Sequence, residues 1–325
     1  MNVESAKIRD AVEKFDGLSI GLLGDVCADV WTFTTPKPGP RPGAALILAQ
    51  DDAEIRPGRA GGVAGAMAAL GAKVSLVGVV GEDGPGQMLA DALEKSGVPS
   101  EGMIRSHEYL TPTRTLILAG PYGRARRLVA RVDQEMMAGL PSGLAGQVLA
   151  KVREVAPGVA GWLLSDHGYG IAAPGVASML EGTRVAESRH RIDNFQGMTA
   201  LVVSSTEAER VTGHDVKDDG QARATAGELF DKTGAGHLLL TRGGLGMTLF
   251  APDGREGRLP PVTQLEAADA VGAGDAAAAA FTMALCARAS VEDAAAIANL
   301  VAGFQIGRPG TAAVTRAEVL AVLGD

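Results

Sequence analysis

Short apolar runs that end in a glycine or a polar residue recur along this chain of 325 residues, with helical patterns between them. A near-continuous apolar run is typical of a strand that is buried on both faces of a parallel sheet. Alternation of such strands with helices over most of a chain predicts a doubly wound α/β fold, in which helices flank a mostly parallel sheet. The clearest runs are "LSIGLLGDV" at 18–26, "KVSLVGVVG", "GWLLSDHG", "ALVVSS" and "GHLLLTRGG".

Two stretches depart from this alternation. Residues 30–56 are rich in proline and glycine, and residues 107–135 show alternating patterns around a "GPYGR" turn, as in a hairpin. We find no internal repeat and no linker long enough to divide the chain. We therefore expect a single domain over 1–325, with a small β lid formed by the segments near 30–56 and 107–135.

Composition limits the class of protein. The formal charge of −8 disfavours nucleic acid or an anionic membrane as the main partner. Only two cysteines occur, Cys27 and Cys286, and their spacing suits neither a disulfide framework nor a zinc site. The charged N-terminus does not resemble a signal peptide, and the apolar stretch at 276–286 is too short to span a bilayer. We expect a cytoplasmic protein with no nucleic-acid and no membrane partner.

The segment "DAVGAGDAAAAAF" at 269–281 carries the strongest chemical signal. Gly272 and Gly274 allow a tight turn, and the alanine-rich segment after them begins a helix whose first free amides form an anion site. Asp275 lies at this junction. It can accept a proton from a hydroxyl that attacks a phosphoryl group held by those amides, or it can only cap the helix.

Other strand ends carry polar residues that suit a phosphate and its counter-ion. "TRGGLGM", which begins at Thr241, forms either a second phosphate cradle or an ordinary turn. In "STEAE", which is centred on Thr206–Glu209, the carboxylates either organise Mg²⁺, directly or through water, or only begin an acidic helix. In "GDVCAD", Asp25 and Asp29 either hydrogen-bond sugar hydroxyls or act as caps.

Several common motifs are absent from the sequence. There is no GxxxxGK[ST], HExxH or CxxC, and the glycine-rich "PGRAGGVAG" precedes a helix and then a strand. That order is the reverse of a dinucleotide-binding fingerprint, so a nicotinamide-dependent dehydrogenase is disfavoured.

Taken together, these segments resemble the ribokinase-like (PfkB) carbohydrate kinase family over nearly the whole chain. "RPGRAGGVAGAMAALGAKVSLVGVVGEDGPG" is similar to its N-terminal signature, and "DAVGAGDAAAAAFTMAL" is similar to its C-terminal one. "GDVCAD", "TPTRTLILAG", "LLTRGGLGMTLF" and "ANLVAGFQIGRPGTAAVT" resemble most closely the heptose-7-phosphate kinase branch. That branch often carries a second, nucleotidyltransferase domain marked by HxGH, which does not occur here, so we expect the kinase half only.

The resemblance implies transfer of phosphate from ATP, with Mg²⁺, to a hydroxyl of a sugar or sugar phosphate, and a homodimer formed through the lid. It implies a role for each of the following residues. Asp275 is the catalytic base and Gly272, Ala273 and Gly274 are its anion hole; Asp25, Asp29, Gly58 and Gly62 are substrate-binding; Thr241, Gly243, Gly246 and Asn299 are nucleotide-binding; Thr206 and Glu209 are on the metal side.

The chain also departs from the family pattern. Where the signature usually reads Gly-Gly-Ala-Ala-Asn, this chain reads Gly-Arg-Ala-Gly-Gly at 58–62, and a second asparagine is replaced by Ala66. Thr206 replaces the asparagine of the Asn-x-x-Glu motif, and Tyr169 replaces a lysine. These changes keep a second hypothesis open, in which the protein binds a nucleotide or sugar and retains the kinase fold without efficient catalysis.

Overall fold

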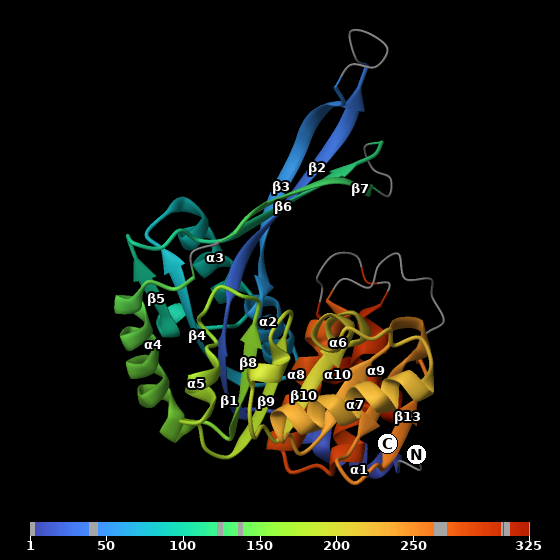
Figure 1. Cartoon of the computed structure of the whole chain (residues 1–325). Helices are drawn as coiled ribbons and strands as arrows, with labels where there is room; N and C mark the ends of the chain where they lie inside the picture. Colours follow the sequence, from blue (N-terminus) through green and yellow to red (C-terminus); the bar gives the residue numbers. More distant parts are fainter. Residues whose placement is uncertain are drawn as a thin grey trace.

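The main body of the protein is built on a mostly parallel sheet (Figure 1). The computed structural model describes residues 4–38, 45–121, 126–135, 139–262, 272–306, 308 and 313–324. Within these residues the sheet has nine strands, and β12 and β13 are antiparallel at one edge. In spatial order they are β13 (Glu256–Leu259), β12 (Met247–Phe250), β11 (Leu238–Thr241), β10 (Ala200–Ser204), β9 (Thr183–Ser188), β8 (Gly161–Asp166), β1 (Ser19–Gly24), β4 (Lys73–Gly81) and β5 (Met103–Ser106).

Helices cover both faces of this sheet, which confirms the predicted doubly wound class. Successive residues of a strand point to opposite faces, so Leu22 and Leu23 of β1 enter two separate apolar cores. One core includes α1 (Ser5–Glu13), α2 (Ala60–Ala69), α3 (Gly84–Lys95), α8 (Ala273–Cys286), α9 (Val291–Gln305) and α10 (Arg316–Leu323). The other includes α4 (Ser142–Val155), α5 (Pro174–Ala177), α6 (Ser205–Thr212) and α7 (Asp219–Thr233).

A second, small sheet projects from the body and forms the lid (Figure 1). Its strand order is β3-β2-β6-β7, with antiparallel pairing except between β2 and β6. The strands are β2 (Val26–Lys37), β3 (Ile47–Arg59), β6 (Thr113–Ala119) and β7 (Arg127–Gln134). Only Asp25 separates β1 from β2, and β3 leads directly into α2, so the base of the lid is continuous with the sheet.

Small side chains bring α8 close to its neighbours. The five alanines at 276–280 are each at most 2% exposed, and α8 packs against both α2 and α9. Because methyl groups occupy little space, the N-terminal ends of α2 and α8 approach one another at the edge of the sheet. The carboxyl ends of the parallel strands meet at this edge, which is where doubly wound proteins bind ligands. No helix in the described part of the chain is both long enough and apolar enough to cross a membrane.

Candidate active site

The N-terminus of α8 presents free backbone donors. Gly272, its N-cap, has a φ of 80°, in the left-handed region that favours glycine. The first backbone bond of the helix runs from Ala276 N–H to the Gly272 carbonyl at 2.9 Å, so the amides at 273–275 have no acceptor within the helix. Ala273 and Gly274 line a cavity, and the helix start is therefore arranged to receive an anion.

Three cavities surround this helix start. The α9 cavity, of about 580 Å³, lies between β11, α8 and α9 and contains Thr241, Gly243, Gly246 and Asn299. The lid cavity, of about 260 Å³, lies at the base of the lid; the arginine cavity, of about 280 Å³, lies beside it. Asp275 lines the lid cavity and the arginine cavity, and the anion-hole residues Ala273 and Gly274 line the α9 cavity. The sequence-predicted catalytic loop thus connects all three.

Burial makes Asp275 a stronger base than an ordinary aspartate. Loss of hydration raises its pKa to about 6, Arg114 and Arg59 oppose this shift, and the charges of Asp29 and Glu207 add to it. The neighbouring Glu187 has a pKa raised to about 8, mainly by burial and then by Asp275. Ionised at neutral pH, Asp275 can accept a proton from a hydroxyl placed in the lid cavity.

The lid cavity contains the expected substrate-binding residues Asp29, Gly58 and Gly62. Arg114 of β6 donates two hydrogen bonds to the Asp29 carboxylate, one of them from Nε at 2.9 Å. A Cβ at Gly58 would overlap the Asp29 carboxylate, and one at Gly62 would lie 2.8 Å from Asp275 Oδ2. The two glycines therefore leave room for the two carboxylates to face the same space.

Asp25 lies elsewhere. We predicted that it binds substrate, but its carboxylate is fully buried and lines none of the three cavities. It accepts backbone N–H bonds from His167, Tyr169 and Ile171 at 2.7, 2.9 and 3.0 Å. Burial raises its pKa and these three bonds oppose that shift. Asp25 therefore holds the loop after β8 in place beneath the site.

The expected metal pair is separated. Thr206 lines both the α9 and the arginine cavities, but Glu209 lines neither, because its Oε1 accepts the N–H of Val216 at 2.9 Å. Glu207 lines the arginine cavity instead, and its carboxylate accepts the N–H of Ser204 at 2.8 Å in a capping box. The Ser-x-x-Glu spacing at 204–207 was the sequence signal for this residue.

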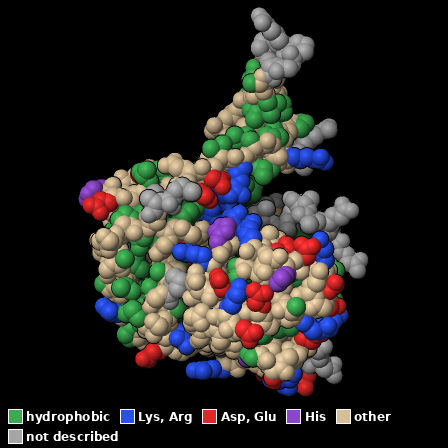
Figure 2. Space-filling model, in the orientation of Figure 1, with side chains coloured by type: hydrophobic (Ala, Val, Ile, Leu, Met, Phe, Trp, Pro, Cys, Tyr) green, Lys and Arg blue, Asp and Glu red, His purple; other side chains and the backbone are tan. Residues whose placement is uncertain are grey.

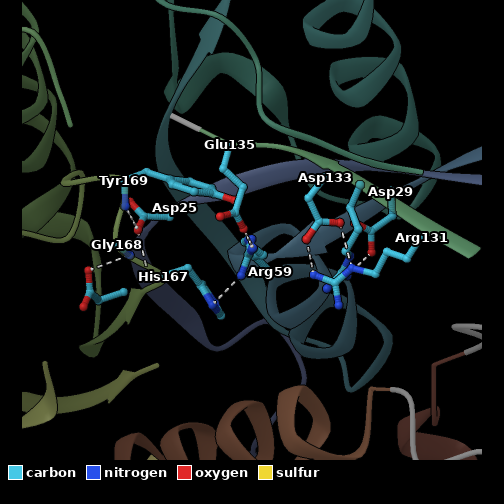
Figure 3. A network of polar contacts seen from close by, with 11 residues as sticks. Asp25, Asp29, Arg59, Arg131, Asp133, Glu135, His167, Gly168 and Tyr169 are labelled. Carbon is cyan, nitrogen blue, oxygen red and sulfur yellow. Dashed lines mark hydrogen bonds and ion pairs between the residues drawn. The ribbon is translucent and has the colours of Figure 1, made fainter. Parts of the chain in front are cut away.

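Sequence reasoning missed the basic side chains of the site. Figure 3 shows part of this polar network, which connects the loop after β8 with the lid. No local pattern identified these residues, which come from the lid, from the loops after β8 and β9 and from α6. The basic residues that line the arginine cavity are Arg59, Arg114, His167, Arg189 and Arg210.

The α9 cavity has the size of a small-molecule site and contains all four residues that the sequence predicts to bind the nucleotide. Gly243 and Gly246 have φ values of 53° and 79° and form the turn between β11 and β12. Asn299 is largely buried and donates from Nδ2 to the Pro260 carbonyl at 2.8 Å. A Cβ at Gly303 would lie 2.6 Å from Val262 Cβ, so this wall of the cavity admits no larger residue.

Comparisons with known proteins identify the family of the chain. Residues 23–138 and 185–317 match the model of the pfkB family carbohydrate kinases. The chain is 31% identical over 314 residues to "Bifunctional protein HldE" of Azorhizobium caulinodans, covering 94% of this chain and 64% of that protein. It is 30% identical over 317 residues to the protein of that name in Stutzerimonas stutzeri, and this match covers 95% of this chain and 64% of that protein. The chain thus spans less than two thirds of these curated relatives.

Solved structures show the same fold. Ribokinase of Arabidopsis thaliana, complexed with ribose and ATP, superposes with a TM-score of 0.76 at 19% identity and covers 95% of this chain and 99% of its own. Phosphofructokinase-2 of Escherichia coli, in complex with substrates and products, superposes with a TM-score of 0.74 at 17% identity, and the match covers 95% of this chain and 100% of that one.

A structural role for Asp25 is testable with Asp25→Asn. The variant keeps the volume but directs an NH₂ group at backbone donors, so we expect the free energy of unfolding to fall by about 2–4 kcal/mol. Urea unfolding followed by circular dichroism measures this change. The matched control is Asp231→Asn on the exposed side of α7, which should change stability by less than about 0.5 kcal/mol. Unchanged stability with a raised KM for the acceptor would restore the substrate-binding role.

Proposed function

The chain belongs to the pfkB family of carbohydrate kinases, and we propose that it transfers the γ-phosphoryl group of ATP to a hydroxyl of a sugar or sugar phosphate, with Asp275 as the base. Membership of the family makes it a sugar kinase, which transfers phosphate to a hydroxyl group. The observation that carries the finer proposal is the place of Asp275. It borders the lid and arginine cavities and lies beside the free amides of α8 that face the α9 cavity.

Each part of this arrangement has a distinct role in the proposed reaction. The acceptor hydroxyl lies in the lid cavity, where Asp29 and Arg114 orient the sugar through hydrogen bonds. Asp275 accepts the proton of the attacking hydroxyl. The amides at 273–275 donate to the transferring group and stabilise the charge that develops on it. Since these donors are fixed by the helix, they need no rearrangement during the reaction.

The residues also fit ATP and Mg²⁺. The α9 cavity supplies a backbone turn for phosphates at Gly243–Gly246 and an apolar wall at Ala302 and Gly303. Among the described residues, no group of three metal-ligating side chains occurs. This suits Mg²⁺, which binds through one or two carboxylates together with substrate phosphates. Glu207, and Thr206 through water, are the residues that would hold the ion, and its chemistry is to neutralise phosphate charge.

The relatives support a particular class of acceptor. The resemblance to the heptose-7-phosphate kinase branch and the similarity to the HldE proteins favour a heptose-phosphate-like sugar. Gly62 and Ala66 stand where the family has asparagines, so the contacts to the sugar differ at these two positions. We also propose a cytoplasmic location, which is supported by the two buried free cysteines, because a reducing compartment preserves thiols.

The first test replaces the base. Asp275→Asn removes proton acceptance but keeps the shape of the side chain, so we expect kcat to fall by about 10²–10⁴-fold while ATP still binds. The variant should also be more stable at pH 7 by about 1 kcal/mol. A carboxyl whose pKa is raised in the fold destabilises the folded state above its unfolded pKa, and solvent in the cavities reduces the effect.

Kinetics with a panel of sugars and sugar phosphates, calorimetry with ATP and thermal unfolding together measure these outcomes. The control is again Asp231→Asn. Turnover near that of the unaltered protein in Asp275→Asn would exclude Asp275 as the base. Binding of ATP and sugars by the unaltered protein, with no turnover of any acceptor, would favour the non-catalytic hypothesis.

The raised pKa of Asp275 predicts the pH dependence. The base acts only when it is ionised, so kcat/KM should fall about tenfold per pH unit below about 6 and reach a plateau above it. An ordinary aspartate, with a pKa of 3.8, would give a plateau that extends down to about pH 4. Initial rates in constant-ionic-strength buffers between pH 4.5 and 8, in the range where the fold is intact, separate the two profiles.

We propose further that two copies of the chain associate through the lid. Its strands expose Ile47, Leu128, Val129 and Val132, which are 41–59% accessible, and Figure 2 shows apolar side chains gathered along the lid. Val132→Lys places a charge on this surface and should shift the protein from dimer to monomer mass in analytical ultracentrifugation. Val322→Lys, at an equally exposed valine of α10, is the control. A monomeric unaltered protein would contradict the proposal.

A further inference from the structure

Arg59 adopts a backbone conformation that an arginine rarely takes. Its φ of 57° and ψ of −128° fall in a region that is readily open only to glycine, and the residue lies at the junction of β3 and α2. The family pattern has glycine at this position. Such a conformation persists only where surrounding contacts hold it, and it often marks a functional position.

Contacts from three directions hold the Arg59 side chain (Figure 3). Its Nη2 donates to Glu135 Oε1 at 2.9 Å, and its Nη1 lies 3.1 Å from His167 Nδ1. The guanidinium lies over the Tyr169 ring, 5.0 Å from the centroid. The side chain is only 3% exposed, and its Nε is buried with no partner among the described residues. A buried cation therefore retains unused donor capacity.

Two more arginines face the same cavity. Arg189 and Arg210 line the arginine cavity with Arg59, and neither guanidinium forms an ion pair with a carboxylate in the described part of the chain. Arg210 Nη1 donates only to the Arg189 carbonyl, at 3.5 Å. Burial lowers the pKa of Arg189, and the charges of Arg59, Arg131 and Arg210 lower it further. Figure 2 shows basic side chains gathered where the lid meets the body.

Carboxylates offset this charge only in part. Glu207 and Asp275 line the cavity, but Glu207 caps α6. Arg114, the fourth arginine of the cavity, is paired with Asp29. Three guanidinium groups in about 280 Å³ thus repel one another, and a bound anion would relieve this repulsion through charge-assisted hydrogen bonds.

The position of the cluster favours the acceptor as the source of the anion. Arg59 lies at the junction of β3 and α2, at the base of the lid, and pairs with the lid residue Glu135; it does not line the α9 cavity. The arginine cavity shares Arg114 and Asp275 with the lid cavity. It also shares Ser204 and Thr206 with the α9 cavity, so a phosphate of the nucleotide is the competing occupant.

We propose that Arg59 is a specificity-determining residue that binds, together with Arg189 and Arg210, an anionic group of the acceptor, either a phosphate or a carboxylate. This inference rests on the proposed sugar kinase function. Glu135 occupies one edge of the Arg59 guanidinium and competes with the anion for it. An acceptor without a negative charge leaves Arg59 with Glu135 as its carboxylate partner and Arg189 and Arg210 with none among the described residues, and it binds more weakly.

The test compares Arg59→Gly, Arg59→Lys and, as a remote control, Arg153→Gln on the exposed side of α4. Acceptors are used as matched sets: a neutral sugar, its terminal phosphate ester and its terminal carboxylic acid. Arg59→Gly should raise KM for the preferred anionic acceptor by about 10–100-fold without raising KM for ATP, and Arg59→Lys should restore part of the loss. The better of the two anionic acceptors identifies the anion. A rise in KM for ATP alone, or equal use of the neutral sugar, would overturn the proposal.

A second measurement does not depend on turnover. Calorimetry with inorganic phosphate, in the absence of nucleotide, should show binding to the unaltered protein and to Arg153→Gln, and at least about tenfold weaker binding to Arg59→Gly. Glu135→Gln should bind phosphate about three- to tenfold more tightly, because the competing carboxylate is gone. If no acceptor is phosphorylated, the kinase proposal fails and this measurement still decides whether the cluster binds an anion. Equal phosphate affinity in Arg59→Gly overturns the inference.

The weaker phosphate binding expected of Arg59→Gly must be distinguished from a loss of folding. Glycine suits the left-handed backbone at position 59, and this gain offsets part of the loss of the contacts with Glu135, His167 and Tyr169, so Arg59→Gly should remain folded at the temperature of the binding measurements. Circular dichroism and thermal unfolding of each variant verify this before the binding measurements.

Discussion

Close packing of α8 against α2 is the constraint on which the site depends. The buried alanines of α8 allow the two helices to approach. A Cβ at Gly62 of α2 would lie only 2.8 Å from Asp275 Oδ2, so glycine at this position leaves room for the carboxylate. At the first turn of α8, the free amides and the carboxylate therefore lie together at the strand ends. A larger residue on either helix would move Asp275, the proposed base, away from the lid cavity, so small size is here a requirement of the proposed site.

The electrostatics of the site follow from this crowding. Burial raises the pKa of Asp275 to about 6 and that of Glu187 to about 8, and nearby carboxylate charges add to both shifts, from Asp29 and Glu207 at Asp275 and from Asp275 and Glu207 at Glu187. Arg59 and Arg114 oppose the shift at Asp275. Asp275 thus remains ionised at neutral pH while being more basic than an exposed aspartate. Without the arginines the pKa of Asp275 would be higher, and without the neighbouring carboxylates it would be lower.

Local patterns predicted the parts of the site that a short segment specifies. The glycine turn before α8, the strand runs and the turn after β11 each follow from neighbouring residues, and the structure has them where the sequence indicated. Asp25 and Glu209 show where prediction from local sequence fails. Asp25 accepts hydrogen bonds from the loop at 167–171, and Glu209 accepts one from Val216 N–H, and both partners are brought into place only by tertiary packing. The arginines were missed for the same reason: Arg59 and Arg210 are 151 positions apart and share one cavity.

The lid is part of the site because the ladder between β2 and β6 carries two of its residues. Asp29 and Arg114 are directly paired neighbours in this parallel ladder, so the ion pair forms as the two strands associate. Gly58 lies opposite Cys27 in the adjacent pair, where a side chain would collide with the Asp29 carboxylate. One residue farther along β3 is Arg59, which is tied to the lid residue Glu135. The register of three lid strands therefore fixes the charges of Asp29, Arg114 and Arg59 relative to Asp275, and a change in lid geometry would move these charges within the proposed acceptor site.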